Sequence, residues 1–319
     1  MYYSFPYKTK QFFWLAIKLA IVIGCGYLIY SKLLENDQLQ FSVFYENLIF
    51  YDVFQIKNIL LLLIFTFFNY FFEILKWESL ASSYTKITRK AAAIQSLAAL
   101  TASLITPNRI GEYGAKAMYF KQSLRTQIVG LNVVGNVYQM GMTIIFGVLG
   151  FGYFMYQHIL SIDFYKVFKF LLFGLFVVFA LFLCTKYFKC IGNSSNKVKT
   201  FIKKIPFRLH LKIALFSFLR FVVFSHQFYF LIGVFKVDIS YLNAISAITS
   251  MYLIASIFPM LSLLDVVLKG TVAIWIFYFY GVEPVTILSI TTLMWIANFV
   301  FPAIIGSYFV LTFKPNLVK

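Results

Sequence analysis

Long apolar runs separated by short polar segments make up most of the chain. A run of about 18 apolar residues or more is long enough to form a helix that crosses a bilayer core of roughly 30 Å. The pattern predicts an all-α fold, a polytopic transmembrane helical bundle in which residues 1–319 form a single integral membrane domain. Six full spans are expected, at about 12–30, 57–75, 128–156, 166–185, 211–235 and 285–312.

Two shorter apolar stretches, about 91–106 and 240–259, each run into a proline that is followed by charged residues. Both flanks of the first stretch are basic, and basic flanks are retained on the cytoplasmic side. We therefore expect a re-entrant hairpin that enters from inside, turns near Pro107 and returns; irregular backbone at membrane depth is tolerated where protein buries it. The span before the second stretch is expected to end outside, and the last span must end inside. The segment between them therefore crosses the membrane an even number of times, which predicts a hairpin that enters from outside.

The charges of the connecting segments predict the orientation of the chain. Segment 31–56 is acidic on balance, whereas segment 186–212 carries eight basic residues and no acid. By the positive-inside rule, both termini are cytoplasmic in a multi-pass protein of the cell inner membrane. The net charge of +17 is explained in this way and by attraction to anionic lipid, so nucleic acid is not expected as a partner.

The two hairpins suggest an internal repeat with opposite topology. "ASLITP" (Ala102 to Pro107) resembles "ASIFP" (Ala255 to Pro259), and each is followed by an acid and then by a lysine four residues later. The repeat halves would be 1–156 and 160–312. Inverted repeats with broken helices are the architecture of many secondary transporters. The alternative is chance similarity, because these residue types recur freely in an apolar chain.

The charged residues after the two prolines are the candidate substrate-binding site. They are Arg109, Glu112 and Lys116 in the first hairpin and Asp265 and Lys269 in the second. Charged side chains at membrane depth are costly and usually face a cavity or one another. One interpretation is two self-neutralising ion pairs with an acid–base spacing of four. The other is headgroup binding, in which Arg109 and Lys116 take a phosphate and the acids take an amine or a proton.

Three further polar residues are weaker site candidates. Asn132 and Asn136 lie on one face of a predicted helix, where hydrogen bonds between helices or a ligand path are the alternatives. Arg220 lies midway along the fifth span, either in the cavity or paired with an unidentified acid. Glu73 and Lys76 fall where the second span leaves the membrane, and we expect them to extend toward the interface.

The sequence lacks the common motifs of soluble enzymes and nucleotide-binding proteins. We find no phosphate-binding loop, dinucleotide fingerprint, zinc-protease motif or nucleophile elbow, and no hydrophilic segment reaches 40 residues. The three cysteines form no CxxC pair. No cofactor and no metal site are therefore expected, and enzymatic activity is not the leading hypothesis.

The segment "TPNRIGEYGAKAMYF" resembles the hallmark of the lysylphosphatidylglycerol synthase transmembrane-region family. Pro107, Arg109, Gly111, Glu112 and Lys116 carry the resemblance. The sequence departs from the family pattern in having Ala115 where an arginine is frequent, and Asn132 and Asn136 where an acid–base pair is frequent. The resemblance implies a membrane protein that moves lipids or takes part in lipid-linked glycan chemistry, without the soluble synthase domain.

The expected function is therefore an integral membrane lipid translocase, similar to a flippase or scramblase. Its substrate would be an anionic, aminoacylated or polyprenyl-linked lipid, with membrane lipids as its partners. One alternative is a membrane subunit that anchors or feeds a separately encoded synthase or glycosyltransferase. Another is an intramembrane transferase with Glu112 as general base.

Overall fold

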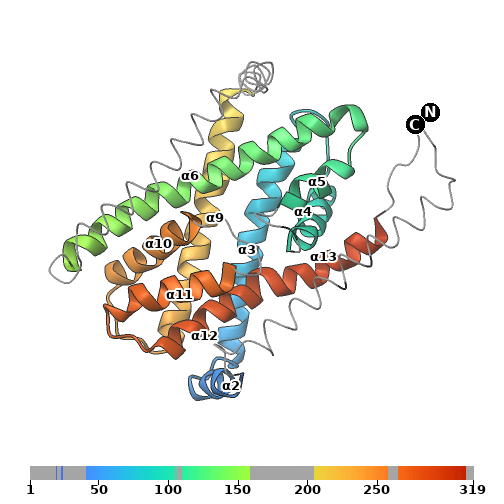
Figure 1. Ribbon diagram of the computed structural model, residues 1–319. Helices are drawn as coiled ribbons and strands as arrows, with labels where there is room; N and C mark the ends of the chain where they lie inside the picture. Colours follow the sequence, from blue (N-terminus) through green and yellow to red (C-terminus); the bar gives the residue numbers. More distant parts are fainter. Residues whose placement is uncertain are drawn as a thin grey trace.

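The computed structural model describes residues 41–104, 106, 110–158, 205–257 and 265–313, together with Leu19 and Ile23. Within these ranges the chain is helical and has no strand (Figure 1). The elements are α2 (Phe41–Phe50), α3 (Ile56–Ala81), α4 (Arg89–Leu104), α5 (Ile110–Met118), η1 (Gln122–Leu124), α6 (Arg125–His158), α9 (Phe207–Val234), α10 (Tyr241–Ile257), α11 (Asp265–Tyr278), α12 (Pro284–Trp295), η3 (Ile296–Val300) and α13 (Phe301–Thr312).

Three helical segments are long and apolar enough to cross a membrane: Ile56–Ala81, Gln122–His158 and Pro284–Thr312. The shortest has 26 residues, which makes it about 39 Å long at 1.5 Å per residue. These segments fit the prediction of a helical membrane protein. Helix α9 occupies the predicted 211–235 span, whereas the predicted spans at 12–30 and 166–185 fall outside the described residues apart from Leu19 and Ile23. The number of six spans stays a prediction.

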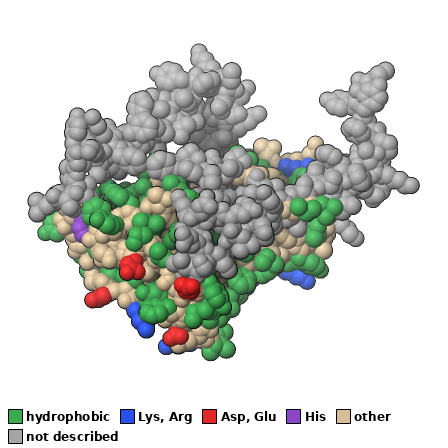
Figure 2. All heavy atoms as spheres, turned by 60° about the horizontal axis from the view of Figure 1, so that its bottom comes forward, with side chains coloured by type: hydrophobic (Ala, Val, Ile, Leu, Met, Phe, Trp, Pro, Cys, Tyr) green, Lys and Arg blue, Asp and Glu red, His purple; other side chains and the backbone are tan. Residues whose placement is uncertain are grey.

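Helix α3 reverses the usual distribution of polar and apolar residues. Phe67 and Leu60 are 62% and 53% exposed, while Glu73 and Lys76 are 8% and 2% exposed. In water this arrangement would be unfavourable, since ionised side chains are almost never fully buried unless they are paired. In a bilayer the apolar face contacts lipid and the polar face turns to the protein interior. On the face that Figure 2 shows, hydrophobic side chains are spread over the visible surface of the described residues.

Two pairs of short helices occupy the positions of the predicted hairpins. Helix α4 ends at Leu104, α5 begins at Ile110, and the two pack against each other. Helix α10 ends at Ile257, α11 begins at Asp265, and these two also pack together. The Thr88 hydroxyl accepts the backbone N–H of Ala91 at 3.2 Å, which is the usual cap of a helix start.

Two close helix contacts depend on glycine. At Gly306 of α13, a Cβ atom would overlap the carbonyl oxygen of Leu97 and the hydroxyl of Thr101 on α4. At Gly147 of α6, a Cβ atom would lie 2.5 Å from the Cβ of Leu253 and 3.1 Å from the Thr249 carbonyl on α10. Small residues let membrane helices approach at backbone distance, so each hairpin is held by a glycine of a long segment.

A π-helical turn, η3, interrupts the last long segment where a proline follows. Pro302 has no N–H to give to the carbonyl of residue 298, four positions earlier. The Tyr70 hydroxyl of α3 donates to this Asn298 carbonyl instead. The turn therefore exposes a backbone acceptor that α3 satisfies, and it ties the last segment to the middle of the bundle.

We expect Tyr70→Phe to lower the stability of the purified protein by about 1–2 kcal/mol, because it removes the hydroxyl that donates to this buried carbonyl. The measurement is unfolding by sodium dodecyl sulfate in mixed micelles, followed by circular dichroism. Tyr308→Phe is the control, since Tyr308 is 65% exposed on α13. Equal midpoints for the two variants would contradict the assigned hydrogen bond.

Candidate functional site: a buried charge cluster

Five ionisable side chains from three helices meet inside the bundle and form what we call the charge cluster. They are Glu73 and Lys76 of α3, Glu112 and Lys116 of α5, and Arg220 of α9. The first four side chains are between 1% and 10% exposed, and Arg220 is 19% exposed. The cluster is therefore sealed from the surface except along α9.

Lys116 connects α5 to α3 and α6. Its Nζ donates to Glu112 Oε1 at 2.8 Å and to Asn132 Oδ1 of α6 at 2.9 Å. The same ammonium lies 3.6 Å from Glu73 Oε1 and 4.4 Å from the centre of the Trp77 ring. An ammonium has three donors; two of them are used by Glu112 and Asn132, and Glu73 and the Trp77 ring lie beside the charge.

Glu73 is the acid that joins the cluster together. Lys76 Nζ lies 2.7 Å from its Oε2, Arg220 donates to the same oxygen, and Lys116 approaches its other oxygen. One carboxylate therefore contacts three cations on three different helices. In the membrane interior this mutual neutralisation offsets much of the cost of burying the charges.

A chain of amide hydrogen bonds extends from the cluster toward the π-helical turn. Arg220 Nε donates to Asn69 Oδ1 at 2.9 Å, and Asn69 Nδ2 donates to Asn298 Oδ1 at 2.7 Å. Asn298 Nδ2 then donates to Gln227 Oε1 at 2.9 Å, and Gln227 donates to Thr66 Oγ1 at 2.9 Å. Helices α3 and α9 and the η3 turn are thus joined by polar contacts.

Thr106 and Gly111 position the glutamate and the lysine of α5. The Thr106 hydroxyl donates to the Ser103 carbonyl at 3.0 Å and accepts the Gly111 N–H at 2.8 Å, which joins the end of α4 to the start of α5. A Cβ at Gly111 would overlap the Ala102 carbonyl. The short helix can therefore cross closely over α4 and direct Glu112 and Lys116 inward.

Only some of the predicted site residues lie in the charge cluster. The structure brings Glu112, Lys116, Asn132 and Arg220 together, while Arg109 lies outside the described residues. Asn136 is nearby but donates to the Tyr113 hydroxyl, at 2.9 Å. The unidentified acid partner considered for Arg220 is Glu73.

The expectation that Glu73 and Lys76 extend toward the membrane interface is wrong. Both point inward from α3, and Lys76 is only 2% exposed. A signal for this was present in the sequence: Thr66, Asn69, Glu73 and Lys76 recur at spacings of three and four, which places them on one helical face. The distance of a single charge from the end of the span does not reveal this stripe, which is seen only when the four positions are considered together.

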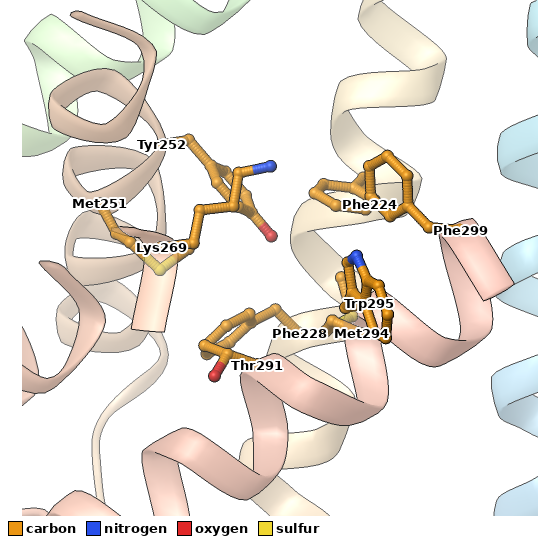
Figure 3. Close-up of a pocket in the computed structure, with 9 residues that line it drawn as sticks. All are labelled: Phe224, Phe228, Met251, Tyr252, Lys269, Thr291, Met294, Trp295 and Phe299. Atoms are coloured by element: carbon orange, nitrogen blue, oxygen red, sulfur yellow. The ribbon is translucent and has the colours of Figure 1, made fainter. Parts of the chain in front are cut away.

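The second hairpin places its lysine in a different setting. Lys269 of α11 lines a pocket between α9, α10, α12 and η3, with its Nζ 5.8 Å from the centre of the Phe299 ring (Figure 3). Asp265 is the first residue of α11. The structure thus assigns Lys116 to the charge cluster and Lys269 to an aromatic pocket.

The charge cluster contains three cationic and two anionic side chains, so its composition suits an anionic group. Within the described part of the chain, no three His, Cys, Asp or Glu residues gather in a way that could hold a metal ion. Comparisons of this chain with protein-family models, with curated proteins and with solved structures found no match.

Proposed function

We propose that this protein is a lipid translocase of the flippase or scramblase kind, which passes an anionic, aminoacylated or polyprenyl-linked headgroup through a polar site inside the membrane. The observation that carries the proposal is the charge cluster, buried among helices that can cross a bilayer. Charges in such a place are costly, and those that are retained commonly mark a substrate or ion pathway. The excess of cations favours a phosphate or carboxylate as the group that is recognised.

The closed cluster describes one state of a transport cycle in this proposal. Lys116 is held by Glu112, Glu73 and Asn132. An incoming phosphate would replace the carboxylates as partner of Lys116 and Arg220, and Glu112 would take up a proton or the amine of an aminoacylated headgroup. Arg220 is the most exposed member of the cluster, so the α9 side is the proposed entrance.

The pattern of helix contacts supports an inverted repeat in which α3, α4, α5 and α6 correspond to α9, α10, α11 and the α12–α13 segment. Helix α4 packs on α13, and α10 packs on α6, so the first hairpin helix of each half contacts the long segment of the other half. Within each half, the two hairpin helices pack together, and the second of them packs on the following long segment. Helices α3 and α9 pack on each other and would flank the axis.

Residue positions support the same correspondence. Pro259 stands 152 positions after Pro107. The α4 residues that meet Gly306 are Leu97 and Thr101, and the α10 residues that meet Gly147 are Thr249 and Leu253. Thr249 and Leu253 also stand 152 positions after Leu97 and Thr101. The prolines and the hairpin residues that meet the glycines therefore have the same spacing, as duplicated architecture would give, while the glycines themselves are 159 positions apart.

The distribution of exposed charge supports the proposed orientation in the inner membrane. Around the α3–α4 loop, η1 and the start of α9, the exposed charges are basic: Lys86, Arg89, Lys90, Lys121, Arg208 and Lys212. Around the start of α3, the end of α9 and the α11–α12 turn, acids and bases are mixed: Asp52, Lys57, Lys236, Asp238 and Glu283. The basic end is therefore the proposed cytoplasmic end.

We expect Glu112→Gln to slow lipid movement roughly tenfold or more, since a charge-assisted hydrogen bond of about 1.5–3 kcal/mol would be lost from the site. The measurement uses liposomes with fluorescent phosphatidylglycerol in both leaflets and a membrane-impermeant quencher outside. Wild-type protein should make the inner pool quenchable. Asp265→Asn tests whether the second hairpin takes part.

Glu78→Gln is the matched control, because Glu78 lies on α3 outside the cluster and pairs with the exposed Arg89 at 3.2 Å. This variant should transport like the wild type. If wild-type protein leaves the inner pool as protected as in empty liposomes, movement of this lipid is refuted. Co-purification of a separately encoded synthase or glycosyltransferase would then favour the anchoring or feeding role.

A further inference from the structure

Asn132 of α6 carries a buried hydrogen-bond donor that the charge cluster does not use. The residue is 3% exposed. Its Oδ1 accepts from Lys116 Nζ at 2.9 Å, whereas its Nδ2 has no hydrogen-bond partner within the described structure. The orientation of the amide follows from chemistry, because the ammonium it faces is a donor and has no lone pair to accept from Nδ2. A buried polar group without a partner is uncommon in folded proteins and calls for an explanation.

The surroundings of this donor are cationic. Lys116 is bonded to the same amide, and Lys76 of α3 approaches the same face of α6: a Cβ atom on Gly135, three residues after Asn132, would lie 3.8 Å from Lys76 Cε. The two ammonium groups share an acid, since they lie 3.6 Å and 2.7 Å from the carboxylate of Glu73. A donor beside two cations suits an acceptor that carries negative charge.

An anionic ligand can reach this donor by exchange with a carboxylate, so a preformed cavity is not required. Glu112 holds Lys116 from α5, a helix of only nine residues. A phosphate that replaced Glu112 on Lys116 would lie beside the Asn132 amide, because that amide is bonded to the same ammonium. The Nδ2 group would then donate to a phosphate oxygen. With Glu112 protonated, one anion has replaced another and the net charge of the cluster is unchanged.

An aminoacylated headgroup fits the same place less well. Its ammonium groups need acceptors, but Glu73 and Glu112 are both engaged with cations of the cluster. What Asn132 offers at this place is a donor, and an ammonium is also a donor. Each added ammonium would increase the positive charge of a cluster in which cations already outnumber acids.

We propose that Asn132 determines the charge specificity of the cluster: its Nδ2 donates to the phosphate of a lipid with a net negative headgroup, and this favours such a lipid over an aminoacylated one. The proposal rests on the proposed function and narrows its substrate class to anionic headgroups, phosphates linked to polyprenyl chains included. Asn132→Asp would reverse this chemistry, because it keeps an acceptor for Lys116 but replaces the unused donor by a negative charge.

The test is native mass spectrometry of the purified full chain in detergent, titrated with phosphatidylglycerol or with lysyl-phosphatidylglycerol of the same acyl chains. The measured quantity is the ratio of the two dissociation constants. We expect the wild type to bind phosphatidylglycerol roughly tenfold more tightly, which corresponds to one charge-assisted hydrogen bond. Asn132→Asp should bring the ratio to about one or reverse it. Asn132→Leu, which removes the donor without adding charge, should give an intermediate ratio.

Asn136→Leu is the matched control, because it removes the same side chain one turn later on α6, where Nδ2 already donates to the Tyr113 hydroxyl at 2.9 Å. This variant should keep the ratio of the wild type. A wild type that binds the two lipids equally, or a preference that survives Asn132→Asp, would overturn the proposal. Displacement of phosphatidylglycerol by an equal concentration of inorganic phosphate would also overturn it, in favour of a soluble anion.

The readout is binding, so it is independent of lipid movement. Charge-selective binding that depends on Asn132, without transport in liposomes, would retain the role of Asn132 and reject the translocase. Transport without this selectivity would retain the translocase and reject the role of Asn132.

Discussion

Glu73→Gln is expected to destabilise the protein by about 3–5 kcal/mol, which is typical of removing one partner from a buried ion pair. Lys76, Lys116 and Arg220 all contact this carboxylate. Without it, three buried cations share Glu112 as the remaining acid of the cluster, and the neutral amide at position 73 does not offset their charge. The measurement is the midpoint of unfolding by sodium dodecyl sulfate in mixed micelles, with size-exclusion chromatography before and after.

A second substitution separates loss of charge balance from loss of packing. Glu73→Gln combined with Lys76→Met removes one cation together with the acid, and should recover about 0.5–3 kcal/mol relative to the sum of the single changes. Glu78→Gln is the control for removing an α3 carboxylate at a partly exposed pair, and should change stability by less than about 1 kcal/mol. Similar midpoints for Glu73→Gln and Glu78→Gln would mean that the cluster does not hold α3, α5 and α9 together.

Glu73 also shows why the sequence predicted only part of this site. Glu112 and Lys116 are four residues apart on one short segment, so their pairing follows from helical geometry alone. Contacts of Glu73 with Lys116 and Arg220 join residues that are far apart in the chain, and no local pattern encodes them. The polar stripe on α3 indicates that its charges face the protein, but which helices supply their partners depends on the packing of the bundle.

In the fold, too, features that depend on local sequence were predicted, and features that depend on packing were not. Apolar run length correctly predicted the three long apolar segments, and α3 extends past the expected end at residue 75 to Ala81 because its last turns are buried by α4 and α6 rather than by lipid. Proline and charge after two shorter runs correctly placed the paired helices. The π-helical turn was not predicted, although Pro302 is present in the sequence, because the donor to the Asn298 carbonyl is the Tyr70 hydroxyl on a distant helix.

Gly306→Ala and Gly147→Ala are expected to destabilise the protein, each costing about 1–3 kcal/mol through overpacking. At Gly306 the new methyl group overlaps a backbone carbonyl, which cannot rotate away, and at Gly147 it lies 2.5 Å from a backbone-attached Cβ. Separating α4 from α13, or α10 from α6, relieves the overlap but loses close helix contact. Unfolding midpoints in mixed micelles measure the cost.

The pair of variants also tests the proposed repeat, because the two glycines, although 159 positions apart, contact hairpin residues that are 152 positions apart and should respond alike. Gly141→Ala is the control on α6: its added methyl meets no atom within 4 Å, so alanine should be neutral or slightly stabilising there. Similar losses at Gly306 and Gly147, with none at Gly141, would support two hairpins held by matching contacts in opposite halves. A Gly147→Ala protein as stable as the Gly141→Ala protein would show that the α6–α10 contact does not depend on glycine as the α4–α13 contact does. The charge cluster would then be the only support for transport, and the inverted repeat would lose its support from the glycine contacts.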